Sequence, residues 1–305
     1  MRNWPRVVML AAAAWTGAAA AREFRALVYR GPAVCQNCPG ALAQLLESSP
    51  QKVAVTYAGP GEKVKVTAES LRNVDVFATS SPVPHTDLDG AWAEIQDAAP
   101  AIRDFVSRGG RYMGVCLGAF LAGFSPGLGI LPAGTDVDRE IDQRRTQVAN
   151  DSDTLIQVDW TFQSDAAGHA RGQTVRDRWA YFQDGVAIKG LPGARRRARD
   201  RAGGDAVLAR YSQSGDVAAS RTPHGDGWVV LVGIHPEATS LWCKSGASRP
   251  LFPVLSCPVL PPPSRSGFGL QILIPDKRLE IAVFGLVIAA VASGLTPTPL
   301  RDYYE

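Results

Sequence analysis

Apolar runs alternate with stretches of helical spacing through the first half of this chain. Short runs rich in β-branched and aromatic residues predict strands, and apolar residues three or four positions apart predict helices. The predicted strands are residues 25–29, 52–58, 74–78 and 111–115, and the predicted helices are residues 39–47, a short stretch from residue 67, and residues 87–107. This alternation favours an α/β fold with a mainly parallel sheet flanked by helices.

The helical stretch at residues 87–107 has the most regular apolar spacing in the chain. Pro100 lies inside it. Because proline has no N–H and its ring clashes with the preceding turn, we expect a kink or break near Ala99. Gly109 and Gly110 follow and should end the helix.

The second half of the chain predicts mixed strands before its character changes. These strands are residues 154–160, 179–182, 207–211, 216–220 and 228–232. The basic run at residues 195–201 is typical of a solvated loop, with a specific anion site as the alternative. We expect one domain over residues 22–250, followed by a proline-rich linker and apolar tail over residues 251–305.

The first 21 residues have the pattern of a cleaved signal peptide. Basic residues precede an apolar run at residues 7–15, and small residues follow at 18–21. We predict a secreted, extracellular protein, with an N-terminal membrane anchor as the alternative. Asn150 begins an Asn-Asp-Ser tripeptide and is a candidate glycosylation site in a secreted eukaryotic chain.

The apolar run at residues 281–295 is short for a transmembrane helix, and Glu280 stands at its start. It favours a loosely attached helix over a membrane anchor. The formal net charge of +3 over 305 residues argues against nucleic acid as a partner, because nucleic-acid-binding proteins usually carry a concentrated basic face.

The chain has five cysteines: Cys35, Cys38, Cys116, Cys243 and Cys257. In an oxidising compartment most should be paired, and an odd number leaves at least one free or bridged to another chain. We expect Cys35 to pair with Cys38 and Cys243 with Cys257, which leaves Cys116 free. The Cys-x-x-Cys spacing also suits a redox or metal role, but two ligands make a poor zinc site, so we expect no metal.

Cys116 is the candidate nucleophile. It stands in the sequence Gly-Val-Cys-Leu-Gly, between a predicted strand and a segment of small residues. This is the cysteine form of a nucleophile elbow, in which Gly114 and Gly118 permit the tight turn. The helix that follows should favour the thiolate through its dipole. A buried structural cysteine is the alternative interpretation.

His235 and Glu237 are the candidate base and orienting group. They follow the predicted strand at residues 228–232, in the sequence His-Pro-Glu. A thiol nucleophile needs a neighbouring base, and the base needs a group that holds its ring. A lone His-x-Glu is usually a surface loop, but two matching elements at strand ends make chance an unconvincing explanation.

These residues resemble a known family. The stretches GGRYMGVCLGAFLAG and VGIHPEA are similar to the N-terminal-type domain of biotin-protein ligase, a member of the class I glutamine amidotransferase-like group. The resemblance extends over about residues 25–242, including the strand-loop at 28–32 and the segment at 179–185. Cys35-x-x-Cys38 is similar to the motif of secreted fungal members.

The resemblance implies a flavodoxin-like sheet and a triad of Cys116, His235 and Glu237. It does not imply biotin ligation, which belongs to a separate catalytic domain, and no cofactor is expected. Glutaminases of this class usually carry Gln where this chain has Phe120. The family's glycine-rich oxyanion loop is replaced by residues 79–85, whose prolines have no N–H to donate. The Leu117 N–H is then the remaining oxyanion donor.

Two hypotheses follow for the function. In the first, the chain is a secreted cysteine hydrolase or amidotransferase-like protein that attacks a small-molecule amide or ester. In the second, it is a non-catalytic descendant that binds a small ligand or a protein partner at the crevice where the strands end. The loop at residues 79–86 distinguishes them, because catalysis needs a second oxyanion donor facing Cys116.

Overall fold

The computed structural model describes residues 23–32, 34, 35, 37–49, 53–80, 88–124, 126–151, 154–163, 169–191 and 206–238. Several predicted features lie outside these residues, namely the signal peptide, most of the 79–86 loop, the basic run at 195–201, Cys243, Cys257, and the linker and tail. The domain limits therefore stay predictions.

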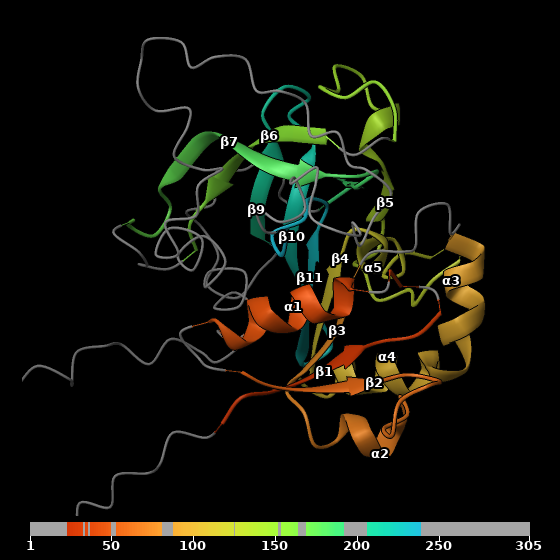
Figure 1. Ribbon diagram of the computed structural model, residues 1–305. Coiled ribbons are helices and arrows are strands. Elements are labelled where there is room, and N and C mark those ends of the chain that lie inside the picture. The colour runs from red at the N-terminus through yellow and green to blue at the C-terminus, as the bar shows by residue number, and fades with distance from the viewer. Residues whose placement is uncertain are drawn as a thin grey trace, which may run out of the picture.

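Within the described residues, eleven strands form one sheet, and its first half is parallel (Figure 1). This half consists of β1 (Arg25–Tyr29), β2 (Ala54–Ala58), β3 (Val76–Thr79), β4 (Arg111–Val115) and β11 (Gly227–Val232). They lie in the order β2-β1-β3-β4-β11, with every neighbouring pair parallel. Parallel pairing brings the carboxyl ends of all five strands to one edge of the sheet, where ligands bind in open α/β folds.

The second half of the sheet is antiparallel and continues from β11. Its strands are β5 (Asp136–Arg139), β6 (Thr154–Thr161), β7 (Thr174–Phe182), β8 (Val186–Lys189), β9 (Ala206–Tyr211) and β10 (Val217–His224). The order β11-β10-β9-β6-β7 extends the parallel half, and β8 pairs with both β10 and β5. β11 therefore joins the two halves, parallel to β4 and antiparallel to β10.

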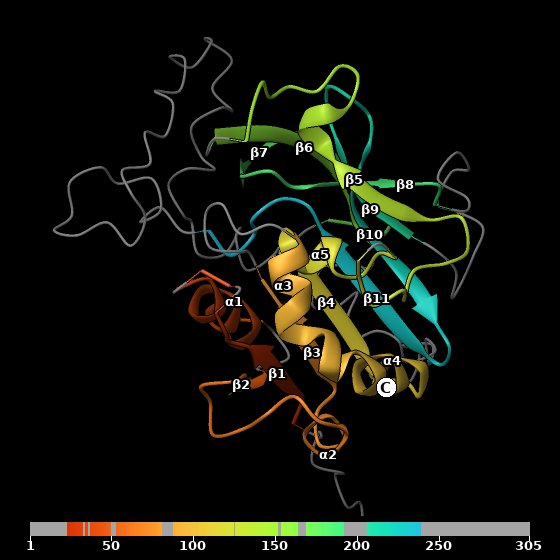
Figure 2. The same ribbon diagram turned by 90° about the vertical axis from the view of Figure 1, so that its right-hand side faces the viewer.

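Helices cover both faces of the parallel strands. They are α1 (Cys38–Glu47), α2 (Ala68–Leu71), α3 (Leu88–Ile95) and α4 (Ala99–Ser107), with a 3-10 turn at Gln96–Ala98. The long predicted helix is broken where Pro100 predicts it, and α4 restarts with that proline in its first turn. In Figure 2, α1 and α4 lie on opposite sides of the strands.

Alternate strand residues supply the two hydrophobic cores. On one face, Val76 and Met113 pack in a cluster with α1 residues such as Leu42, whereas Phe77 and Tyr112 pack in a second cluster with residues of α4. Because strand side chains alternate between faces, a sheet covered on both sides buries all of them. Accordingly, every residue of β4 is buried.

The predicted α/β fold is confirmed: parallel strands flanked by helices form the core, as in flavodoxin-like sheets. The antiparallel half, which the sequence predicts only as mixed strands, is part of the same sheet. None of the helices in the described part of the chain is both long and apolar enough to cross a membrane.

Candidate functional site

Cys116 stands directly after β4, at the carboxyl edge of the parallel strands. Its backbone has φ 50° and ψ −110°, a conformation that is rare for a residue with a β-carbon. The chain leaves the turn as α5 (Leu117–Phe120), so strand, cysteine and helix form an elbow. The Cys116 N–H donates to the carbonyl of Val232, the last residue of β11, at 2.8 Å.

Close backbone packing explains both glycines of the elbow. A β-carbon on Gly114 would overlap the carbonyl oxygen of Gly118, and one on Gly118 would overlap that of Thr79 at the end of β3. The Tyr112 hydroxyl also donates to the Gly118 carbonyl, at 2.5 Å. The elbow is therefore held against β3 and β4. Since α5 has only four residues, its dipole is weaker than the sequence leads one to expect.

His235 reaches the same edge from the neighbouring strand. Val232 pairs with Val115 across β11 and β4, and His235 follows Val232 by three residues. The His235 N–H donates to the carbonyl of Tyr181 at 2.9 Å, and the two rings meet edge to face with centroids 5.5 Å apart. These contacts fix the imidazole beside the elbow.

Glu237 holds the far side of the imidazole. Its Oε1 lies 3.0 Å from Nδ1 of His235, and the two side chains are only 0% and 1% exposed. The His235 ring is also hydrogen bonded to the Cys116 side chain. The structure thus brings together the three residues that the sequence selects, from the ends of β4 and β11.

The charges at this site favour an imidazolium. Burial alone disfavours the charged ring, but the Glu237 carboxylate and the Cys116 sulfur outweigh burial and raise the pKa of His235 to about 10. The second carboxyl oxygen of Glu237, Oε2, has no hydrogen-bond partner among the described residues. The charge of this carboxylate is therefore balanced mainly by His235. The positive charge of the ring therefore lies next to the sulfur of the candidate nucleophile.

A further contact at the nucleophile has no local signal in the sequence. Cys116 Sγ lies 3.2 Å from the carbonyl oxygen of Gln183, at the end of β7. The dipeptide Asp184-Gly185 indicates a turn there. The meeting of this turn with a cysteine 67 positions earlier depends on the assembled sheet.

Glu140 is a second group that the sequence does not identify. It follows β5 in a polar stretch, yet it is 0% exposed, and the side chains of Ser214 and Thr146 are polar neighbours of its carboxyl group. Desolvation raises the pKa of Glu140 to about 7. Its own N–H donates to the carbonyl of Gly185 at 3.0 Å, which places it behind the turn that touches Cys116.

The oxyanion donors are only partly within the described chain. Leu117 is the first residue of α5, so its N–H has no partner inside the helix and is available to a ligand. Thr79 and Ser80 are buried at the end of β3, and residues 81–86 of the loop in question lie outside the described residues. The expectation that this loop lacks a second oxyanion donor therefore stays a prediction.

The remaining predicted residues are a cysteine pair and a glycosylation candidate. Cys35 and Cys38 form a disulfide, with Cα atoms 5.3 Å apart, at the start of α1. Cys116 is the free cysteine of the described chain. Asn150 is exposed, as a glycosylation acceptor must be. The described residues contain no group of three metal-ligating side chains.

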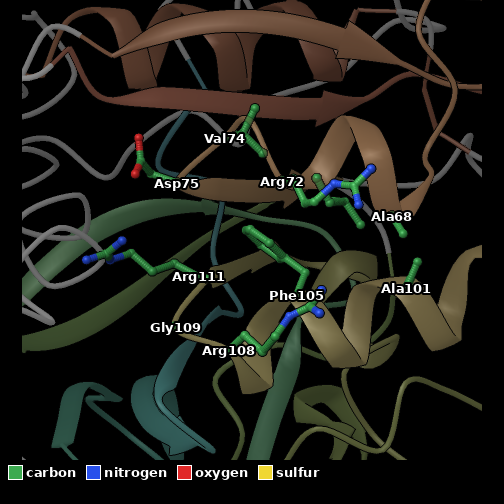
Figure 3. Close-up of a pocket in the computed structure, with 11 residues that line it drawn as sticks. Ala68, Arg72, Val74, Asp75, Ala101, Phe105, Arg108, Gly109 and Arg111 are labelled. Carbon is green, nitrogen blue, oxygen red and sulfur yellow. The ribbon is translucent and has the colours of Figure 1, made fainter.

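A pocket of about 400 Å³ lies at the opposite end of the strands, between α2 and α4 (Figure 3). It is lined by residues that precede β3 and by the start of β4, whereas Cys116 follows the end of β4. The side chains of Arg72 and Arg111 project to opposite sides, so they do not converge on one ligand. This pocket is separate from the candidate site.

No protein-family model matches the sequence, and no curated protein matches it. Several solved structures resemble the chain. PurLQS from Thermotoga maritima has 16% identity and a TM-score of 0.43, over 73% of this chain and 91% of that chain. A glutamine amidotransferase from Thermotoga maritima has 10% identity and a TM-score of 0.45, over 72% and 78%. A β-galactosidase from Bacillus circulans sp. alkalophilus has 16% identity and a TM-score of 0.37, over 70% and 28%.

Proposed function

We propose that this chain is a cysteine-nucleophile hydrolase or amidotransferase-like protein that acts on a small amide or ester. The observation that carries the proposal is the buried line of Cys116, His235 and Glu237, with 3.0 Å between Nδ1 and Oε1. A nucleophile, a base and an orienting carboxylate in contact are the parts that covalent acyl transfer requires.

Each residue has a distinct role in this mechanism. The protonated His235 ring stabilises the Cys116 thiolate, which attacks the substrate carbonyl to form a tetrahedral oxyanion, and the Leu117 N–H donates a hydrogen bond to that oxyanion. His235 then gives its proton to the departing amine or alcohol, which leaves an acyl thioester on Cys116. Water, activated by His235, hydrolyses the thioester and restores the thiol. Glu237 keeps the ring oriented throughout.

The substrate class follows from what the site contains. Phe120 stands where glutaminases of this class carry Gln, so glutamine is not the substrate we favour. The predicted signal peptide and the resemblance to secreted fungal members of the biotin-protein-ligase N-terminal type support an extracellular amide or ester.

A non-catalytic descendant of the fold is the second candidate function. The contact of Cys116 Sγ with the Gln183 carbonyl favours it, because that oxygen occupies space beside the sulfur. Cys116 is also only 3% exposed. In this case the strand-end crevice would bind a small ligand or a protein partner without turnover.

A labelling experiment separates the two candidates. The full secreted chain is treated with a panel of electrophilic amides and esters, and modification of the Cys116 peptide is followed by mass spectrometry. We expect labelling at Cys116 and turnover of at least one class, with His235→Ala lowering turnover about 10²–10⁴-fold because the base is lost.

His224→Ala is the matched control, since this histidine lies on β10 away from the elbow and should leave turnover unchanged. The proposed enzymatic function would be contradicted if Cys116 is labelled no faster in the folded chain than in the denatured chain and if His235→Ala does not change the labelling rate. Rapid labelling without turnover would favour the binding protein.

A further inference from the structure

The turn after β7 makes a contact with the nucleophile that the proposed mechanism does not use. Cys116 Sγ has two partners of opposite effect: the His235 ring and the Gln183 carbonyl oxygen, 3.2 Å away. The imidazolium favours a thiolate. A carbonyl oxygen accepts hydrogen bonds and donates none, so it attracts the protonated thiol and repels a thiolate.

The residue after Gln183 has an unusual backbone. Asp184 has φ 47°, one of four non-glycine residues with positive φ in the described chain. This conformation costs free energy in a residue with a β-carbon. Rotating the peptide plane between Gln183 and Asp184 would turn the carbonyl away from Cys116 and return Asp184 to negative φ.

The surroundings of this peptide are fixed. Gly185 packs so closely on Gly233 that a β-carbon would overlap the Gly233 carbonyl oxygen, and its own carbonyl accepts the Glu140 N–H. On the other side, the Tyr181 carbonyl accepts the His235 N–H. A rotation confined to one peptide plane therefore leaves its neighbours in place.

An ion pair anchors the side chain of Asp184. Arg139 Nε lies 2.8 Å from Asp184 Oδ1, with the side chains 41% and 35% exposed. Arg139 comes from the end of β5, which is paired with β8. The pair thus ties the turn to a neighbouring strand at the surface, where solvent ions reach it.

We propose that the Gln183–Asp184 peptide is a latch that holds Cys116 as an unreactive thiol until the peptide rotates. The Arg139–Asp184 ion pair keeps the latch closed. Opening removes the carbonyl from the sulfur, so that the thiol can lose its proton to solvent beside the His235 imidazolium and the space beside the sulfur becomes free for a substrate. This inference concerns the regulation of the proposed active site and rests on that proposed function.

Two substitutions of one residue isolate the backbone effect. Asp184→Ala and Asp184→Gly both remove the ion pair, but glycine accepts positive φ and alanine does not. Iodoacetamide is the probe, and the rate of alkylation is measured on the Cys116 peptide. We expect alkylation in Asp184→Ala to be at least about fivefold faster than in Asp184→Gly, because alanine drives the peptide out of the latched form.

The chain offers a matched control. Asp177, on β7, also has positive φ, at 55°. Because its carbonyl neighbours are not the ones that contact Cys116, iodoacetamide should alkylate Cys116 at the same rate in Asp177→Ala and in Asp177→Gly. Arg139→Gln is a second route to the same result and should accelerate alkylation about twofold to fivefold, as expected for loss of a half-exposed ion pair.

The outcomes distinguish the latch from the proposed function. Equal rates in the two Asp184 variants, together with no acceleration in Arg139→Gln, overturn the latch, even if His235→Ala slows alkylation as the enzyme requires. A rate difference between the Asp184 variants that persists in a His235→Ala background supports the latch. If His235→Ala by itself changes nothing in the same experiment, the enzyme proposal fails, and the latch, which rests on it, fails with it.

Discussion

The Nδ1 atom of His235 and the Oε1 atom of Glu237 are 3.0 Å apart in a region closed to solvent. The other Glu237 oxygen has no hydrogen-bond partner in the described part of the chain. Glu237 therefore depends on His235 for charge compensation, and removing either member takes a charge partner away from a buried group.

Substitution of Glu237 should destabilise the protein, and the loss should be larger when both the charge and the hydrogen-bond acceptor are removed than when only the charge is removed. We expect Glu237→Ala to cost about 3–5 kcal/mol of unfolding free energy at neutral pH, as for a broken buried ion pair. Glu237→Gln should cost less, because an amide oxygen can still accept the Nδ1–H. Urea unfolding measures both. Equal stability in wild type and Glu237→Ala would contradict the buried pair.

The same pair predicts the direction of a pH dependence. The folded-state pKa of His235 is raised to about 10, above its unfolded value near 6.5. The stabilisation is therefore complete below about pH 6.5 and is lost as the pH rises towards 10. Unfolding between pH 6 and 10 should show this decline in wild type and a flatter profile in Glu237→Gln. Arg30→Gln, which breaks an exposed ion pair with Glu62, is the control and should keep the wild-type profile.

Glu140→Gln should stabilise the protein at neutral and alkaline pH. Because burial raises the folded pKa of Glu140 to about 7, the wild type loses stability as the pH rises from about 4.5 to 7. An uncharged amide avoids this loss, which amounts to about 3 kcal/mol for a shift of this size. Thermal unfolding at pH 4.5 and 8 measures the difference. Glu47→Gln, at an exposed helix end, should show no such divergence.

Gly118→Ala should disrupt the elbow. The new β-carbon would overlap the Thr79 carbonyl, so the backbone must shift, at a cost of about 1–3 kcal/mol. Displacement of Cys116 from His235 should slow its alkylation as well. Gly40→Ala is the matched control: nothing lies within 4 Å of its β-carbon, and it sits within α1. That change should stabilise the protein by about 0.5–1 kcal/mol.

The Cys35–Cys38 bridge closes a short loop, so its contribution should be modest. Loop-closure entropy for four residues gives about 2 kcal/mol, and the double variant Cys35→Ala/Cys38→Ala should lose about that amount. Mass mapping without reduction should find this bridge and an unmodified Cys116. A bridge to Cys116 would be incompatible with its role as nucleophile.

The parallel core could be predicted from the sequence because its signals are local. Apolar runs define β1 and β4, and Pro100 ends one helix and begins another. β5 has no such signal, because it is polar and partly exposed. β8 is not predicted, although its residues Val186 to Ile188 are apolar and buried.

At the site, the elbow and the His-Pro-Glu sequence were enough to select Cys116, His235 and Glu237 as the candidate nucleophile, base and orienting group. The contacts of Gln183 and Glu140 could not be foreseen in this way. Their burial is decided by the turn between β7 and β8 and by the pairing of β5 with β8, which join distant parts of the chain. Nothing in the polar stretch around Glu140 indicates that this one carboxyl group is enclosed.

The position of β11 has a consequence for how the protein is made. This strand follows the other ten in the described chain, yet it lies between β4 and β10 in the middle of the sheet. During synthesis, Cys116 leaves the ribosome long before the strand that covers its backbone and brings His235. The nascent chain therefore carries a thiol without its base, and the two are brought together only when the central gap in the sheet is filled.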